Sequence, residues 1–361
     1  MKLCILSDAA SLHIIEWAQF FTRKGHAVSI ISDNPANIDG VVVYPIPKYE
    51  NKFHIPFISS IYQVTRKTIT IRRLLRKIQP DILHSHYANI YGYLASLTGF
   101  HPHILTCHGS DLLVHPKRSG VEQYFVKCAL KHADKITLPS KEMYQDAVHY
   151  GADPDKITEI QYGVDLQQFR FTNNKKDKNR FLCTRMLTPQ YRTDFIIEAF
   201  SQSATEFPNI SLDIVGEGPE RRKLEKIVTT KSMEEIVKFW GKIEHSDIAS
   251  LYNRASYYIT ASPTDGLSIS LLEAFASGVF PILPDNQSNQ SIADLGFNVK
   301  LYNSDSIDSL STAIKDVLAD SEKLYQKCLH NRKLTEEKYD RSKNLARIET
   351  LYLNMIKESI K

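Results

Sequence analysis

A single carboxylate interrupts an otherwise apolar helical segment in the second half of the chain. Residues 257–276, YYITASPTDGLSISLLEAFA, combine a β-rich run, a loop and a helical pattern in that order. Ser270, Glu273 and Ser277 recur at i, i+3 and i+7, so their side chains lie on one narrow stripe. A carboxylate in this stripe can accept both hydroxyl groups of a ribose. The alternative interpretation is that the stripe simply faces water.

The start of the same helical segment offers a second kind of chemistry. Ser268 or a neighbour begins the helix, whose first N–H groups have no intrahelical partners and lie at the positive end of the helix dipole. These groups suit an anion such as a diphosphate, and Gly266 lets a ligand approach the backbone. Arg185, directly after the β-rich run 181–184, adds a planar permanent cation. The alternative interpretation is that Arg185 is an ordinary surface residue.

Strand and helix patterns alternate along the whole chain, which predicts parallel sheets with crossover helices. The β-rich runs are 2–7, 27–32, 41–46, 81–86, 103–107, 135–139, 157–161, 181–184, 211–216, 236–240, 257–262 and 279–283. The polar stretch 171–180 is typical of a linker. The fold class is therefore α/β, with two Rossmann-like doubly wound domains over 1–168 and 169–341. The tail is helical from about 305, and its last helix, 342–361, is long enough to pack back on the first domain.

The bulk composition excludes several classes of protein. The chain has 361 residues and a net charge of only +4, so it does not indicate nucleic-acid binding. Five scattered cysteines favour a reducing compartment. The first apolar run is too short for a signal peptide, and no window approaches the ~18 apolar residues of a membrane span. We therefore expect a cytoplasmic protein, one that can still lie at a membrane surface.

The segment around Glu273 resembles glycosyltransferase family 4, the retaining "glycosyl transferases group 1" of the GT-B fold. The matching positions are Ser262, Asp265, Gly266, Glu273, Ala274, Phe275, Ala276 and Gly278. The resemblance covers residues 1 to about 353 and implies two domains facing across a cleft. It implies that Glu273 holds the nucleotide ribose and that Asp265 contacts the donor sugar. It also implies that backbone amides at Leu267, Ser268 and Ile269 bind phosphate.

The chain departs from the family pattern at two places in this domain. Asp265 is one methylene shorter than the glutamate that the family usually has there. Arg185 matches a family arginine, but no lysine follows it, so we expect Arg192 to supply the second charge. The turn in 214–225, with Gly216 and Gly218, is predicted to be structural rather than a dinucleotide fingerprint.

In the first domain the resemblance points to TCHGSDLL, residues 106–113. It implies that His108 faces the donor sugar across the cleft, without acting as a general base, and we place Asp111 on the acceptor side. The loop 7–13 lacks the family's glycine pair and has Ala9 and Ala10 instead. His13, at its end, is predicted to face the acceptor.

Residues 64–80 contain six Lys or Arg and no acid, and their apolar and basic residues fall on opposite helical faces. This segment is either a sheet-packing helix with a solvated basic face or a contact for anionic lipid. The apolar stretch 51–62 before it could insert shallowly into a membrane.

Two metal-like motifs have simpler interpretations. We read Asp153 and Asp155 as turn caps. The pairs His84/His86 and His101/His103 each share a strand face but lack further ligands. No metal or cofactor is expected.

The expected function is therefore retaining transfer of a hexose-type sugar from a nucleotide diphosphate sugar, with UDP or GDP as the nucleotide. The acceptor is the hydroxyl of a glycan or a lipid-linked glycan in cell-surface polysaccharide or lipopolysaccharide synthesis. The alternatives are a nucleotide-sugar-binding partner subunit with weakened catalysis and a GT-B sugar-nucleotide epimerase.

Overall fold

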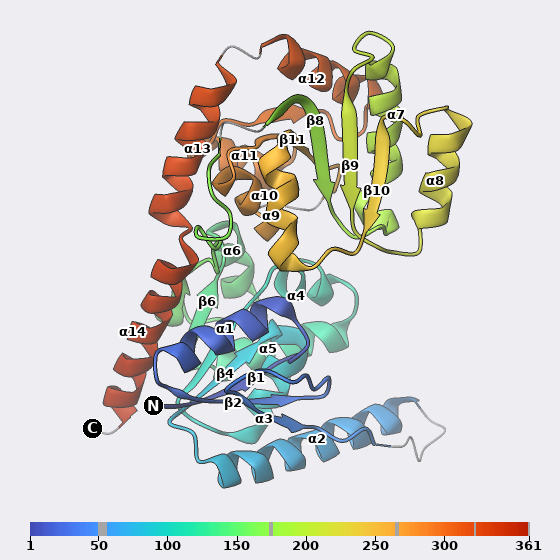
Figure 1. The fold of residues 1–361 in the computed structure, drawn as a ribbon. Coiled ribbons are helices and arrows are strands. Elements are labelled where there is room, and N and C mark those ends of the chain that lie inside the picture. Colours follow the sequence, from blue (N-terminus) through green and yellow to red (C-terminus); the bar gives the residue numbers. More distant parts are fainter. Residues whose placement is uncertain (50–55, 173–175, 264–266, 321–322, 360–361) are drawn as a thin grey trace. The chain divides into compact units, whose positions relative to one another are not determined.

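The computed structural model describes residues 1–49, 56–172, 176–263, 267–320 and 323–359 (Figure 1). The chain divides into two compact units. The first comprises residues 1–162 and 344–361, and the second comprises residues 163–343. Over the described ranges, no helix combines the length and hydropathy that crossing a bilayer requires.

The described part of the first unit is built on a seven-stranded parallel sheet in the order β3-β2-β1-β4-β5-β6-β7. Its strands are β1 Lys2–Leu6, β2 Ala27–Ser32, β3 Val42–Pro45, β4 Ile82–His86, β5 His103–Thr106, β6 Lys135–Leu138 and β7 Ile157–Glu159. Its helices are α1 Leu12–Arg23, α2 Pro56–Ile78, the π-helix η1 Tyr87–Gly92, α3 Tyr93–Thr98, α4 Ser110–Leu113, η2 His115–Lys117, α5 Gly120–His132, α6 Glu142–His149, η3 Pro154–Lys156 and, from residue 344 onward, α14 Arg341–Ser359.

Alternate side chains of β1 show why helices cover both faces of this sheet. Leu3 and Ile5 pack in one apolar cluster with Trp17 of α1 and Tyr352 of α14. Cys4 and Leu6 lie on the other face, in a cluster with residues of α2 and α3. The C-terminal helix therefore completes the core of the first unit, as Figure 1 shows by its position beside α1.

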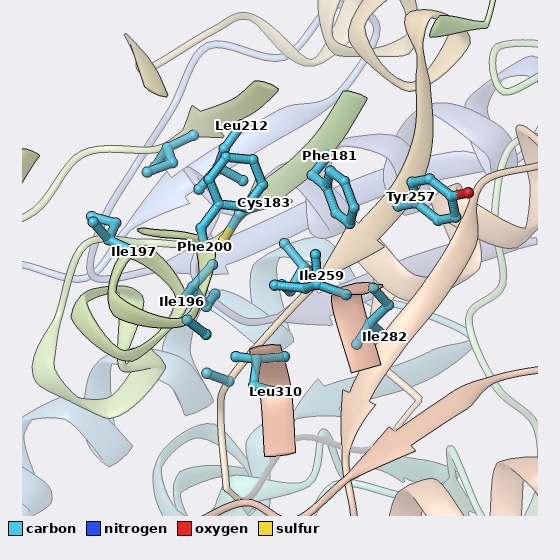
Figure 2. Close-up of a cluster of buried hydrophobic side chains, with 14 of the residues drawn as sticks. Phe181, Cys183, Ile196, Ile197, Phe200, Leu212, Tyr257, Ile259, Ile282 and Leu310 are labelled. Atoms are coloured by element: carbon cyan, nitrogen blue, oxygen red, sulfur yellow. The ribbon is translucent and has the colours of Figure 1, made fainter. Parts of the chain in front are cut away.

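The described part of the second unit has a six-stranded parallel sheet in the order β10-β9-β8-β11-β12-β13. Its strands are β8 Asp177–Thr184, β9 Ser211–Val215, β10 Val237–Gly241, β11 Ala255–Ile259, β12 Phe280–Pro284 and β13 Lys300–Tyr302. Its helices are η4 Pro189–Tyr191, α7 Thr193–Ala204, α8 Arg221–Thr230, α9 His245–Arg254, α10 Ile269–Ala276, α11 Gln287–Asp294, α12 Ile307–Ala319 and α13 Leu324–Lys338. Figure 2 shows the apolar cluster on one face of this sheet, where Phe181 and Cys183 of β8 meet Phe200 of α7 and Leu310 of α12. The opposite face holds Leu182 with residues of α9 and α10.

The stretch 171–180 is not a linker, contrary to its polar composition. β8 begins at Asp177, inside this stretch. Lys176, just before the strand, is partly buried, and its Nζ donates to the carbonyl oxygens of Tyr252 and Ala255 at 2.9 Å each. Within the strand, the polar side chain of Arg180 pairs with the carboxylate of Asp213 at 2.9 Å.

The crossing between the units lies earlier than the predicted boundary at residue 168. Val164 pairs with Asp340 in a parallel bridge, and Val164 and Phe169 are fully buried in the second unit's core. Residues 163–168 therefore belong with the second unit. β13 was not predicted, since its three residues are too short a run to show a period.

Candidate functional site

The helix α10 starts as its sequence predicts. Ser268 is the N-cap, and its Oγ accepts a hydrogen bond from the Leu271 N–H at 3.3 Å. Ile269 and Ser270 occupy the next two positions, where backbone N–H groups have no intrahelical acceptor. Leu267 directly precedes the cap and is partly buried. Asp265 and Gly266 lie outside the described residues.

Glu273 does not face water, so that alternative interpretation of the polar stripe is wrong. The residue is only 4% exposed, and two donors hold its carboxylate. His245 Nε2 lies 2.8 Å from Oε1, and the Tyr252 hydroxyl donates to Oε2 at 3.0 Å. Burial, reinforced by the charge of Glu273, raises the pKa of Tyr252 well above its usual value, so the phenol remains a donor. Each oxygen keeps lone-pair capacity for a further donor.

Sequence reasoning missed both partners of Glu273. His245 and Tyr252 lie on α9 at i and i+7, the spacing that puts two side chains on one helix face. This spacing could have indicated that the two side chains share a face. The residues of α9 by themselves do not show which helix that face contacts. We call Glu273, His245, Tyr252, Arg185 and Ser268 the carboxylate site.

Arg185 lies at the carboxyl end of β8 and reaches α10. Its Nη1 is 3.5 Å from Ser270 Oγ, and its guanidinium lies 4.8 Å from the centre of the Tyr191 ring. A ring face held against a guanidinium restrains its plane. Arg185 is therefore placed beside the first turn of α10.

The contacts of Arg192 differ from those expected of a second phosphate ligand. Its guanidinium packs on Phe195, and its Nη1 donates to the Ser304 carbonyl oxygen at 2.8 Å. Asp305 Oδ1 lies 3.6 Å from the same nitrogen. Among the described residues these contacts tie Arg192 to the loop after β13. Its role toward phosphate stays a prediction.

The glycine turn after β9 supports the loop that carries Arg185. Gly216 has φ of +142°, and a Cβ atom there would collide with the Arg185 carbonyl oxygen. A Cβ on Gly218 would collide with the backbone of Leu187 in the same way. The contacts of both glycines are thus with protein backbone, as the predicted structural role requires.

We expect Gly216→Ala to destabilise the second unit by about 1–3 kcal/mol, because it adds strain and displaces backbone. Urea unfolding followed through Trp240 fluorescence measures the loss. Gly296→Ala is the matched control, since Gly296 has φ of +94° and its nearest neighbour to a new Cβ is 3.7 Å away. An equal loss in both variants would show that backbone angle, and not the contact with Arg185, requires the glycine.

In the first unit, histidines from α1, from β4 and from the loop after β5 form a histidine cluster, which we define as His13, His84, His86 and His108. The rings of His13 and His108 have centroids 5.0 Å apart. His86 Nδ1 lies 3.0 Å from His108 Nε2. The sequence singled out His13 and His108 for the same cleft, and the structure places them side by side. It also adds His86, for which the sequence predicted only a strand face shared with His84.

Buried hydrogen bonds anchor the inner part of this cluster. His84 Nδ1 bonds the Tyr352 hydroxyl of α14, and His84 Nε2 lies 2.7 Å from Thr106 Oγ1. His84 and His86 stack with centroids 4.2 Å apart, so the pair shares a strand face as predicted. Burial, with neighbouring histidines as the lesser cause, lowers the pKa of His84, His86 and His108 well below the usual value. These rings are therefore neutral at neutral pH.

Asp111 holds the loop that carries His108. It is fully buried, and its carboxylate accepts hydrogen bonds from the N–H groups of Ala88, His108 and Gly109 at 2.8–2.9 Å. Gly109 has φ of +116°, a conformation that other residues rarely adopt. These contacts make Asp111 a loop-shaping residue, and its acceptor-side assignment stays a prediction.

In the loop before α1, side-chain oxygens accept hydrogen bonds from the backbone N–H groups of both alanines. Ala9 N–H donates to Ser32 Oγ at 3.0 Å, and Ala10 N–H donates to Asp8 Oδ1 at 2.9 Å. The two alanines therefore stand in a side-chain-capped turn in place of the family's glycines. His13 follows this turn, with its Nδ1 3.0 Å from Ser11 Oγ.

The turn interpretation of Asp153 is confirmed, since its Oδ1 accepts from the Asp155 N–H at 3.1 Å. Across the described ranges, no three His, Cys, Asp or Glu side chains are grouped so that they could hold a metal ion.

Known proteins share both the sequence pattern and the fold. An uncharacterised glycosyltransferase of Methanocaldococcus jannaschii is 25% identical over 254 residues, which are 70% of this chain and 67% of that protein. The alpha-monoglucosyldiacylglycerol synthase of Acholeplasma laidlawii is 23% identical over 283 residues, 67% of this chain and 71% of the synthase. The crystal structure of Anabaena HepE in complex with UDP-glucose superposes with a TM-score of 0.77 at 16% identity, covering 97% of this chain and 99% of that one.

Two family models match successive parts of the chain. "Glycosyl transferase 4-like" matches residues 2–140, and "Glycosyl transferases group 1" matches residues 165–334. The matched ranges include both the histidine cluster and the carboxylate site. The chain therefore belongs to the family 4, or group 1, glycosyltransferases of the GT-B fold.

Proposed function

We propose that the protein is a retaining glycosyltransferase that moves a hexose-type sugar from a UDP- or GDP-linked donor to a hydroxyl group. The acceptor is a glycan or lipid-linked glycan in cell-surface polysaccharide or lipopolysaccharide synthesis. The observation that carries the proposal is Glu273, a buried carboxylate held by His245 and Tyr252 one helix turn beyond the capped start of α10. A carboxylate and a helix start at this separation suit a ribose and a diphosphate of one nucleotide.

The diphosphate needs no metal ion in this scheme. Arg185 supplies a permanent cation beside α10, and the helix start supplies N–H donors at Leu267, Ser268 and Ile269. Arg192 is proposed as a further cation.

In the transfer, the bond between the sugar C1 and the diphosphate oxygen breaks, and its electron pair leaves with the diphosphate. The acceptor oxygen forms the new bond to C1 on the same face, and its proton passes to the leaving diphosphate. We place His108 and Asp265 at the donor sugar and His13 and Asp111 on the acceptor side.

A donor assay tests this function. The full-length protein is incubated with UDP-, GDP- and ADP-sugars, and release of the nucleotide is followed with and without a glycan acceptor. Release from one donor, with the sugar appearing on the acceptor in its original anomeric configuration, supports the proposal. Binding without turnover favours a partner subunit that only binds the donor. Conversion to an epimeric donor without acceptor favours an epimerase.

The helix α2 supports a lipid-linked acceptor at an anionic membrane surface. Its residues Ile71 and Leu75 are buried in the first unit's core, which leaves the opposite face outward. Two of its cations are used internally: Lys67 pairs with Asp33 at 2.9 Å, and Arg72 donates to carbonyl oxygens of α3. The outward cations that remain, such as Arg73 and Arg76, are exposed. We propose that the protein works peripherally at the cytoplasmic face of the plasma membrane.

We expect Arg73→Glu/Arg76→Glu to reduce sedimentation with anionic liposomes, because each basic residue near such a surface contributes about 1 kcal/mol. The matched control is Arg222→Glu/Lys226→Glu, the same charge change at exposed positions of α8 in the second unit. Equal pelleting of the unmodified protein with neutral and anionic vesicles would count against membrane contact.

A further inference from the structure

The pair His86 and His108 contains a hydrogen bond between two imidazole rings. His86 ends β4, and His108 follows β5 by two residues; the register of these neighbouring strands puts His86 beside Thr106. The two rings consequently meet, with His86 Nδ1 3.0 Å from His108 Nε2. At this distance one nitrogen must donate a proton and the other must accept it.

Both rings carry a single proton. His86 is fully buried, and burial lowers the pKa of His86 and of His108 well below the usual value. A neutral imidazole has one N–H and one bare nitrogen. Only two arrangements are therefore possible, and they differ in which ring donates across the 3.0 Å contact.

The second nitrogen of His86 distinguishes the two arrangements. His86 Nε2 is buried and has no hydrogen-bond partner among the residues that the structure describes. A proton on this nitrogen would be a buried donor without an acceptor, which costs more than an unused acceptor. The proton of His86 therefore belongs on Nδ1, where it is donated to His108 Nε2. The proton of His108 then lies on its own Nδ1.

Other contacts fix the plane of the His108 ring. The Tyr87 ring stacks on it with centroids 4.2 Å apart and an interplanar angle of 19°. Tyr87 has φ of +68°, a conformation that is unusual for an aromatic residue, and it begins the π-helix η1. The buried Asp111 holds the backbone N–H of His108. Ring plane and proton position are thus both set before any ligand binds.

We propose that His86 is a positioning residue that fixes His108 as the Nδ1–H tautomer, so that His108 presents a hydrogen-bond donor to an oxygen of the nucleotide sugar. This inference rests on the proposed function for the kind of ligand. In this tautomer His108 stabilises a sugar hydroxyl or phosphate oxygen and has no bare nitrogen facing the ligand. It cannot act there as a general base.

Nitrogen NMR tests the tautomer without any substrate. In the full-length protein labelled with ¹⁵N-histidine, and with His108 assigned through His108→Asn, we expect a protonated Nδ1 and a bare Nε2. His86→Leu should shift His108 toward the Nε2–H tautomer. His86→Asn should restore the original pattern, because its amide nitrogen lies close to the position of Nδ1. His103→Gln is the matched control: His103 is equally buried but bonds Ser85 Oγ at 2.7 Å.

Kinetics gives a second readout. We expect His86→Leu to lower kcat about 10- to 100-fold, as loss of a supporting partner commonly does, while the donor KM changes little. His86→Asn should recover most of the rate, and His103→Gln should leave it unchanged.

A proton on Nε2 of His108 in the unmodified protein overturns the inference whatever the activity, and this measurement remains even if His86→Leu fails to fold. Full kcat in a folded His86→Leu variant overturns it as well. An Nδ1–H tautomer in a protein that transfers no sugar supports the tautomer assignment and overturns the proposed function.

Discussion

Glu273→Gln is expected to weaken nucleotide binding about 10- to 100-fold while leaving the fold intact. The change removes the charge that two ribose hydroxyls would bond, and a hydrogen bond to a charged group contributes about 1.5–3 kcal/mol. The amide has nearly the shape of the carboxylate, so the buried space between His245 and Tyr252 stays filled. Calorimetric titration with UDP and with GDP measures the affinities.

Comparing nucleotides with and without ribose hydroxyls tests whether Glu273 bonds those hydroxyls. The unmodified protein should bind a 2′,3′-dideoxy nucleotide much more weakly than the normal one. Glu273→Gln should bind the two with nearly equal affinity, because the partner of the hydroxyls is already lost. Unchanged affinity for the normal nucleotide would refute the assignment.

The matched control for Glu273→Gln is Asp213→Asn. Asp213 is 1% exposed and, like Glu273, accepts two hydrogen bonds, from Arg180 at 2.9 Å and Trp240 at 2.8 Å. It lies on β9 and is not part of the carboxylate site. A similar drop in nucleotide affinity in this variant would assign the effect of Glu273→Gln to general loss of a buried carboxylate.

The first unit is expected to lose stability steeply as the pH falls below about 6.5. Burial lowers the pKa of His103 to about 4, and it also lowers the pKa values of His84, His86 and His108 well below the usual value. A histidine with a depressed pKa binds fewer protons when folded than when unfolded. Its stabilising contribution is therefore complete above the unfolded pKa and is lost as the pH falls toward the folded value. Each such ring adds about 1.4 kcal/mol per pH unit to the slope.

The two tryptophans lie in different units, so the pH dependence of stability can be measured for the first unit alone. Trp17 contacts the rings of His84 and His86, and Trp240 lies in the second unit. In Trp240→Phe, urea unfolding followed by fluorescence between pH 7.5 and 5 reports the surroundings of Trp17. We expect the free energy of unfolding to fall below pH 6.5 by several kcal/mol per pH unit, with a shallower slope in His103→Gln. A Trp17 transition that does not change over this range would contradict neutral buried histidines.

Local sequence patterns were sufficient to predict most of the strands and part of the candidate functional site. The alternation of β-rich runs and helical spacing predicted the strands of both parallel sheets apart from β13, because burial on two faces leaves a continuous apolar run. Ser268 was identified as a helix start from the residue types around it, and the structure makes it the N-cap of α10. Arg185 could be placed because it follows a strand directly.

The structure was needed wherever a contact joins distant parts of the chain. The second unit begins before the predicted boundary at residue 168, because Val164 pairs with Asp340. Local composition does not reveal this contact. In the predicted linker 171–180, residues from Asp177 onward belong to β8, and Lys176 just before it donates to the carbonyl oxygens of Tyr252 and Ala255. In both cases a partner far along the chain overrides the local preference.

The carboxylate in the apolar helix shows the same division. Neighbouring residues alone were enough to predict that Glu273 lies on α10 behind a capped start, since helical period and capping are local properties. The burial of Glu273 between His245 and Tyr252, and the contact of His86 with His108, came from the packing of distant elements. These pairs depend on which helix and which strands lie side by side, and side-chain hydrogen bonds over that distance leave no period in the sequence.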